Sequence, residues 1–183
     1  VPDPSQTPTG TTMLTNVTFT DLSIGQHYCV WVRSHCSASE LGTWFSVCFT
    51  TGQIITPHTG DDIPTLYTLT PSATSENTCP GLLTVHVPDG YHINGVSTAY
   101  QMQTASNGWM SEQRSLLVCN TTGNAESTLT SGVGGSTGTY SYNRSDIHIA
   151  DGAVGNVEFE LRAWRTFGGS NCNADYNKVL ANS

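Results

Sequence analysis

The segment of residues 156–172, NVEFELRAWRTFGGSNC, places the strongest constraint on the fold. Its side chains alternate between a mainly apolar set and a mainly charged set, and this period of two predicts a β-strand with one face in a core and the other in solvent. Gly168 and Gly169 then permit a sharp turn, and Cys172 follows where a disulfide can fix the chain. The inward set is Val157, Phe159, Leu161 and Ala163, and the outward set is Glu158, Glu160, Arg162 and Trp164.

Short alternating segments of the same kind recur along the 183 residues, and no segment has a convincing helical period. Only 11% of the residues are charged and 37% are hydrophobic, with abundant Gly, Thr, Ser and Asn, which suits short strands joined by many turns. We therefore expect an all-β protein built of β-sandwiches. The further predicted strands span residues 13–20, 27–34, 43–51, 65–69, 82–88, 96–104, 115–118, 127–129, 139–142 and 147–149, and residues 1–12 are predicted to be a loop.

Charge and hydropathy argue against two classes of partner. Fourteen acidic residues against six Lys and Arg give a formal charge of -8, which repels a phosphate backbone, so no nucleic-acid partner is expected. No apolar run has the length needed to cross a bilayer, so no membrane insertion is expected either.

Six cysteines are spread through the chain with neither a CxxC motif nor a Cys/His cluster at zinc-ligand spacing. This distribution favours structural disulfides formed in an oxidising compartment, and it predicts an extracellular or cell-surface protein without a metal or cofactor. A hairpin of segments 27–34 and 43–51 would place Cys29 opposite Cys48 on its outward face, within bridging range, with Tyr28, Val30, Val32, Val47 and Phe49 facing inward. For the others we prefer Cys119 with Cys172 and Cys36 with Cys79, although Cys36 has the alternative of a partner outside this chain and one sequence cannot fix the connectivity.

The first fifty residues resemble the second half of a fibronectin type III module. That family has a Leu, a turn with Gly, a Tyr followed by alternating Val, and then an aromatic residue before Thr-Thr. The resemblance implies that residues 1–52 are the C-terminal part of such a module and that the chain begins inside it. The matching residues are Leu22, Gly25, Tyr28, Val30, Val32, Phe49, Thr50 and Thr51.

The second part of the chain resembles a β-sandwich module of large surface proteins from gliding, type IX-secreting bacteria. In those proteins such modules are strung with fibronectin type III units and followed by a sorting domain. The resemblance implies a linker and first strand over residues 53–78, then a jelly-roll-like sandwich over 79–183 that lacks its usual last strand. It rests on residues 79–91, 109–117, 138–152, 157–172 and 175–179.

No catalytic constellation is apparent. There is no G-x-S-x-G elbow and the six histidines are scattered, so hydrolysis by a Ser/His/Asp triad is not expected. Glu158 and Glu160 share one face, as expected of a solvated strand rather than of a glycosidase pair. The pairs Asp61 with Asp62 and Asp146 with Asp151 offer oxygen ligands for Ca²⁺ but lack a loop with enough ligands at fixed spacing.

One group of side chains is typical of a carbohydrate site. Exposed Trp gives a flat apolar face for a sugar ring, while Arg and Glu reach hydroxyl groups. The alternative is structural: Trp109 plugs the edge of the sandwich and Glu112 pairs with an arginine to fix a loop. The group consists of Trp109, Glu112, Arg114, Arg162, Trp164 and Arg165.

The sequence therefore predicts a non-catalytic extracellular binding or adhesion module that engages a polysaccharide or cell-surface glycan. The alternative is a structural subunit of an extracellular fibre, in which strands from neighbouring copies complete the sandwiches. An enzyme is the least favoured of the three classes.

Overall fold

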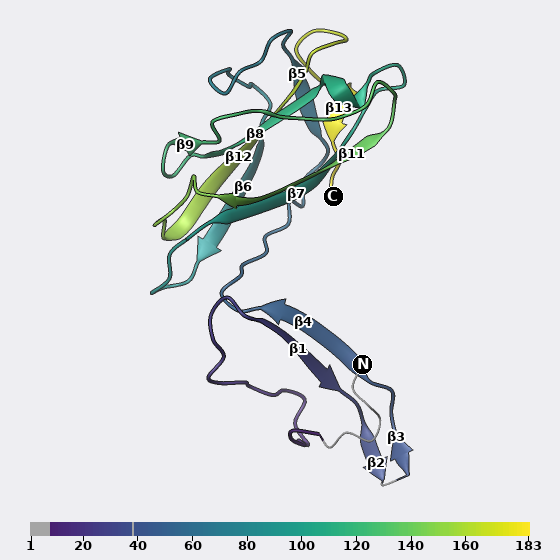
Figure 1. Ribbon diagram of the computed structural model, residues 1–183, viewed down its shortest axis with the longest axis vertical. Helices are drawn as coiled ribbons and strands as arrows, with labels where there is room; N and C mark the ends of the chain where they lie inside the picture. Colours follow the sequence, from purple (N-terminus) through teal and green to yellow (C-terminus); the bar gives the residue numbers. More distant parts are fainter. Residues whose placement is uncertain (1–7, 38) are drawn as a thin grey trace. The chain divides into compact units, whose positions relative to one another are not determined.

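The computed structural model describes residues 8–37 and 39–183 and is almost entirely β, which confirms the predicted class (Figure 1). The first seven residues of the predicted loop over 1–12 lie outside the described residues. The chain divides into two compact units between Ile55 and Thr56, and each is described by itself. Within the described residues, no helix has the length and apolar character needed to span a membrane.

The first unit contains one long hairpin and one short hairpin. Strands β1 (His27–Val32) and β4 (Phe45–Thr50) pair antiparallel, and β2 (His35–Ser37) pairs with β3 (Glu40–Leu41). The strand predicted over residues 13–20 is not formed: this segment is exposed and irregular. Alternating side chains favour a strand, but the backbone groups of a strand need a neighbouring strand for their hydrogen bonds, and no strand of the described residues pairs with this segment.

The second unit, residues 56–183, is a sandwich-like structure made from one curled nine-stranded sheet. The sheet order is β10-β8-β12-β5-β13-β7-β11, with β6 paired to β12 and β9 to β8. A short 3-10 turn, η1 (Met110–Glu112), precedes β8. The strands are β5 (Ile63–Tyr67), β6 (Gly81–Val87), β7 (Val96–Gln103), β8 (Gln113–Cys119), β9 (Asn124–Ala125), β10 (Thr130–Ser131), β11 (Thr139–Ile147), β12 (Gly155–Arg165) and β13 (Cys172–Val179).

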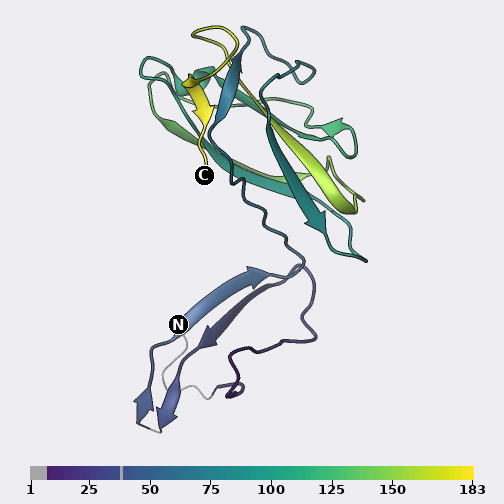
Figure 2. The same cartoon turned by 180° about the vertical axis from the view of Figure 1, so that it is seen from behind.

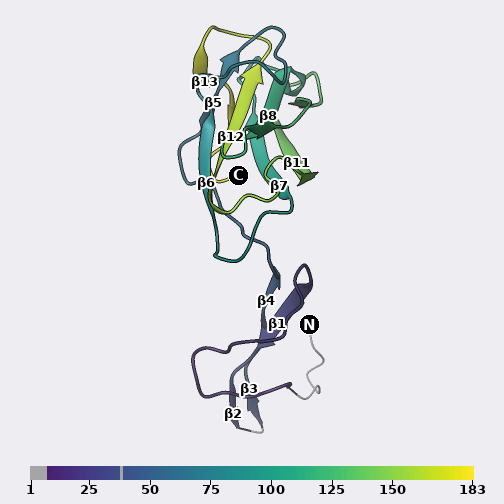
Figure 3. The ribbon, with the colours of Figure 1, turned by 90° about the vertical axis from the view of Figure 1, so that its left-hand side faces the viewer.

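Strand β12, the strand predicted at the start of segment 156–172, lies in the middle of the sheet (Figure 3). It pairs with β8 along one edge, and along the other it pairs antiparallel with β6 and then parallel with β5. The yellow β13 lies beside β5 in Figure 2 and pairs with both β5 and β7. It therefore links the layer that contains β8 and β12 to the layer that contains β7 and β11.

The core lies between these layers in two clusters. One cluster packs Val157 and Phe159 of β12 against Leu117 of β8 and Val87 of β6. The other brings together Ile63, Tyr100, Met102, Tyr142, Ala163 and Val179. The inward set predicted for β12 is therefore confirmed, because Val157, Phe159 and Ala163 are buried and Leu161 packs partly buried against both clusters.

Three strand predictions differ in detail from the structure. Segments 139–142 and 147–149 were predicted as separate strands, but β11 is continuous from Thr139 to Ile147, with an irregular register between Arg144 and Ile147, and residues 148–149 are not in a strand. Segment 127–129 is not a strand, and β13 was missed. In its sequence, CNADYNKV, only Cys172, Ala174 and Tyr176 alternate as apolar residues, and the positions that are buried are instead Asn177 and Val179, so the pattern is a poor indicator of this strand.

Candidate functional site

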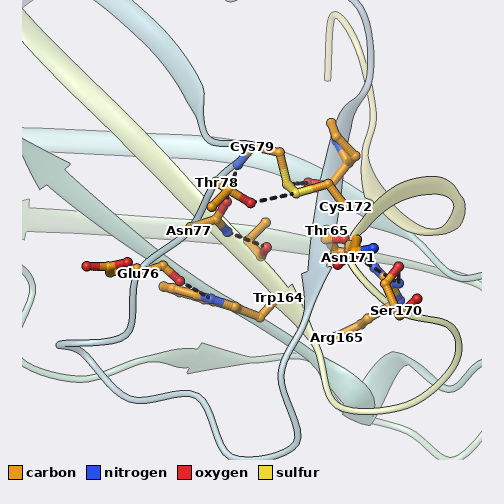
Figure 4. Close-up of a disulfide and its surroundings, with 12 residues drawn as sticks. Thr65, Glu76, Asn77, Thr78, Cys79, Trp164, Arg165, Ser170, Asn171 and Cys172 are labelled. Atoms are coloured by element: carbon orange, nitrogen blue, oxygen red, sulfur yellow. Dashed lines mark hydrogen bonds between the residues drawn. A yellow bond between two sulfur atoms is a disulfide. The ribbon is translucent and has the colours of Figure 1, made fainter.

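Trp164 is completely buried, so its predicted role as an exposed platform for a sugar is wrong. It faces away from the two core clusters, together with Leu116 and Val118 of β8, and Ala73 and Leu129 pack against this third cluster. Its indole nitrogen donates a hydrogen bond to the carbonyl of Glu76, 3.2 Å away (Figure 4). The connection between β5 and β6 therefore covers the face of β12 that the alternation assigned to solvent.

Arg165 is also buried, and its guanidinium donates hydrogen bonds to backbone carbonyl groups instead of being available to a ligand. Its Nε donates to the carbonyl of Gly168 at 2.7 Å, Nη2 to that of Asn171 at 3.1 Å, and Nη1 to that of Thr65. The guanidinium carbon lies 4.7 Å from the centre of the Tyr176 ring. Desolvation lowers the pKa of Arg165, and carbonyl oxygens and an aromatic face take the place of an anionic partner.

The disulfide at this end of the sheet joins Cys79 to Cys172, which corrects the predicted bridges Cys119–Cys172 and Cys36–Cys79 (Figure 4). Cys119 pairs with Phe159 in the middle of β12, whereas Cys172 pairs with Leu66, the partner of Trp164. At about 3.3 Å per strand residue, these two sites lie roughly 16 Å apart along β12. Cys119 is a buried free thiol in the core and Cys36 is an exposed one.

Arg114 and Arg162 are each engaged by near neighbours in sequence. Nη1 of Arg114 donates to the carbonyls of Ser111 at 2.6 Å and Gln113 at 2.7 Å. Nε of Arg162 lies 2.7 Å from Oε1 of Glu160, with both side chains largely buried. Neither arginine pairs with Glu112, so the ion pair that the structural alternative required is not formed.

Trp109 is the one predicted aromatic platform that is open, with 52% of its surface exposed. Oε2 of Glu112 accepts a hydrogen bond from the backbone nitrogen of Trp109 at 2.8 Å and so fixes the start of η1. The carbonyl of Glu112 accepts one from the nitrogen of Thr166 at 3.0 Å, which ties η1 to the end of β12. The six predicted residues therefore do not form one site. Trp109 is exposed, whereas the other five form hydrogen bonds to the backbone, pair with a neighbouring side chain or pack in the interior.

A polar network between the layers was missed by sequence reasoning. Arg144 of β11 donates to Oε1 of Glu126 at 2.8 Å and to the hydroxyl of Tyr100 at 2.6 Å. The Tyr100 hydroxyl in turn donates to Oγ of Ser115 on β8 at 2.6 Å, and burial raises the pKa of this phenol, so it stays neutral. These contacts join β7 and β11 to the opposite layer across the interior, and their role is structural.

Basic side chains of the protein contact one residue of the first acidic pair considered for Ca²⁺ and both residues of the second. Asp62 pairs with Lys178, Oδ2 to Nζ 2.6 Å. His148 lies between Asp151 and Asp146, with nitrogen–oxygen distances of 2.9 and 3.1 Å. Asp62, Asp146 and Asp151 therefore each have a basic side chain of the protein as their partner.

An open hollow of about 460 Å³ lies at the tips of two loops, and no sequence motif predicted it. Pro88, Asp89, Gly90, Tyr91 and His92 line one side, and Val154 and Gly155 the other. Tyr91 is half exposed, but no charged or amide side chain approaches it from the second loop. The polar groups that orient a ligand in a binding pocket are therefore confined to one wall.

The most unusual surface is one face of the β1–β4 hairpin. Cross-strand pairing aligns three apolar pairs on this face: Tyr28 with Phe49, Val30 with Val47, and Val32 with Phe45. Val47 is 54% exposed and Phe45 66%, and none of the first unit's described residues, 8–37 and 39–55, is buried. We call these six side chains the hairpin face. All of them except Phe45, for which no prediction was made, were predicted to point inward, and no layer formed by residues 8–37 or 39–55 covers them.

Comparisons with protein-family models, with curated proteins and with solved structures gave no match. The residues and their geometry are thus the basis for assigning a function.

Proposed function

We propose that this chain is a non-catalytic extracellular binding and adhesion module whose contact surface is the hairpin face. The observation that carries the proposal is the absence of a buried side chain among the first unit's described residues, combined with six apolar side chains aligned on one side of a two-stranded sheet. Contiguous apolar patches of this kind mark sites of protein association. An isolated hairpin is marginally stable, so a covering layer also stabilises it.

The partner that suits this face is another apolar β-sheet face. Two sheets pack by interdigitating side chains at about 10 Å, and the three aligned pairs present such a surface without a charged group. A second copy of the chain supplies the same face, and a two-fold pairing of identical patches satisfies both at once. The first 55 residues contain three of the 14 acidic residues and one of the six basic ones, so charge repulsion between two such units is weak.

The disulfides support an extracellular location. Cys29–Cys48 and Cys79–Cys172 are bonds of a type that persists in oxidising compartments. The resemblances to fibronectin type III and to type IX-associated surface modules point in the same direction. The fibre-subunit alternative uses the same face and differs in its product, an ordered polymer rather than a closed complex.

Polysaccharide binding is retained as a second candidate function on one observation, the exposed indole of Trp109 beside a backbone fixed by Glu112. A glycan array probed with the intact chain and with Trp109→Ala tests it. A saturable signal lost in the variant supports a sugar platform, and binding that is absent, or equal in both proteins, rejects it.

The experiment for the main proposal compares two neighbouring substitutions on β4. Val47→Lys places a charge on the hairpin face, whereas Ser46→Lys places the same charge on the opposite face. Light scattering under non-reducing conditions should give a mass above the 19.6 kDa monomer that rises with concentration for the unmodified chain and Ser46→Lys, but the monomer mass for Val47→Lys. A monomer at every concentration, or equal association of both variants, contradicts the proposal. Negative-stain microscopy distinguishes fibres from closed complexes.

A further inference from the structure

Three potential metal ligands converge on the side of the hairpin opposite the hairpin face. Nε2 of His27 lies 3.7 Å from Sγ of Cys29, and the ligand atoms of His27, Cys29 and Cys48 all lie within 4.8 Å of one another. All three residues are exposed. In the oxidised chain the two sulfurs are joined as a disulfide, which is a weak metal ligand.

The strand geometry explains this convergence. His27 and Cys29 are two residues apart on β1 and therefore share a face, and Cys48 is the cross-strand partner of Cys29. His27 is the partner of Thr50, and its Nδ1 lies 3.3 Å from the Thr50 hydroxyl. A hydrogen bond from Nδ1 to that oxygen leaves the lone pair of Nε2 directed toward the sulfurs, an arrangement common for metal-binding histidines.

We propose that reduction of the Cys29–Cys48 disulfide converts this cluster into a site for a thiophilic divalent cation, with Zn²⁺ as the expected ion. A dithiol reductant supplies two electrons and two protons: the sulfur–sulfur bond breaks, two thiols form, and the reductant becomes a disulfide. The incoming cation displaces both thiol protons into solvent. The resulting site has two thiolates and one neutral imidazole, so with a divalent cation its net charge is zero.

The ligand set determines the class of ion. Two thiolates and an imidazole match the sulfur and nitrogen preference of Zn²⁺ and do not suit Mg²⁺ or Ca²⁺, which prefer oxygen. Because three protein ligands leave a tetrahedral ion one position short, water occupies the fourth. The antiparallel pairing of β1 and β4 keeps Cys29 and Cys48 opposite each other after the bond is cut, so the ligands are close before the ion arrives.

The Cys29–Cys48 disulfide is more accessible to a reductant than the Cys79–Cys172 disulfide. Cys29 and Cys48 are exposed, whereas Cys79 and Cys172 are partly buried, and Cys79 lies at the end of the connection between β5 and β6. A reductant therefore reaches the hairpin bond first. The site is gated by redox conditions: it is closed in an oxidising medium and opens where dithiols are present.

Co²⁺ is a suitable probe because thiolate ligation gives it characteristic charge-transfer and visible absorption bands. The full chain is prepared with Cys36→Ser, which removes the exposed free thiol, and is titrated with Co²⁺ before and after reduction. The reduced protein should bind one Co²⁺ with the intensity of two thiolates, and Zn²⁺ should displace it. The oxidised protein should show no thiolate band.

Matched variants locate the ion. His27→Ala keeps both cysteines and should weaken Co²⁺ binding by at least tenfold, while His35→Ala, on the same unit but outside the cluster, should leave the affinity unchanged. Cys29→Ser with Cys48→Ser should abolish the band. The proposal is overturned if reduction creates no Co²⁺ site, if the double serine variant retains it, or if the two histidine variants bind alike.

Discussion

The indole nitrogen of Trp164 donates a hydrogen bond to the backbone carbonyl oxygen of Glu76, 3.2 Å away. Glu76 belongs to the connection between β5 and β6, residues 68–80, which we call the covering segment. On the next residue of this segment, Nδ2 of Asn77 donates a hydrogen bond to the carbonyl of Ala163 at 2.7 Å. Together these bonds fix the connection between β5 and β6 over the second half of β12. A segment without regular secondary structure thus forms part of the core and removes Trp164 from the surface.

Replacing Trp164 should therefore affect stability rather than binding. Trp164→Ala leaves a large cavity between β12 and the covering segment and should lower the free energy of unfolding by about 3–5 kcal/mol. The control is Trp109→Ala, whose side chain is half exposed and which should cost less than about 1 kcal/mol. Urea denaturation followed by tryptophan fluorescence measures both, and equal losses would contradict the placement of Trp164.

The cysteine connectivity gives a second prediction. Alkylation of the folded, non-reduced chain should modify Cys36 alone, because Cys119 is a buried thiol, and denaturation should then expose Cys119. Peptide mapping should recover Cys79 linked to Cys172, a bridge that closes a loop of 93 residues. Replacing both of these cysteines by Ser should cost roughly 2–5 kcal/mol. A recovered peptide linking Cys119 to Cys172 would refute this arrangement.

The largely buried pair of Arg144 and Glu126, whose side chains are 11% and 13% exposed, should be sensitive to the loss of one partner. Glu126→Ala leaves the guanidinium without its carboxylate and also removes the acceptor of the Leu117 backbone nitrogen, so about 3–5 kcal/mol of stability should be lost. Asp62→Ala removes the more exposed pair with Lys178 and should cost about 1 kcal/mol or less. Thermal denaturation of the two variants tests this ranking, and a larger loss of stability for Asp62→Ala than for Glu126→Ala would contradict it.

His148 should titrate above its ordinary value of 6.5, because the hydrogen bond and charge of Asp151, with a further contribution from Asp146, favour the protonated ring and raise its pKa. The sign follows from linkage: this stabilisation is complete below about 6.5 and is lost as the pH rises through the higher pKa of the folded chain. NMR titration of the imidazole measures it. Asp151→Asn should move the pKa back toward 6.5, and an unchanged titration would show that Asp151 has no such influence.

The sequence predicted those features that depend on local pattern. The alternation in residues 156–164 located β12, and the spacing of two alternating segments placed Cys29 opposite Cys48, as the structure confirms. It also assigned Tyr28, Val30 and Val47 to one face. These inferences need only the two-residue period of a strand and the register of one hairpin.

The features that were wrong or missed depend on contacts distant in sequence. Alternation identifies the face on which Trp164 lies but not the segment that covers it, and Glu76 is 88 residues away. The partner of Cys172 is set by the pairing of β13 with β5, which no local pattern in β13 indicates. For the same reason the contact of Arg144 with Tyr100 had no counterpart in any motif.

Hydrogen–deuterium exchange at low and high protein concentration tests most directly whether the hairpin face is a contact surface. Association through this face should slow amide exchange in β1 and β4 as concentration rises, while exchange in β8 and β12 of the second unit stays constant. Val47→Lys should remove the concentration dependence and Ser46→Lys should keep it. Exchange in β1 and β4 that is independent of concentration, or protection that rises only in the second unit, would contradict the proposed role of the hairpin face.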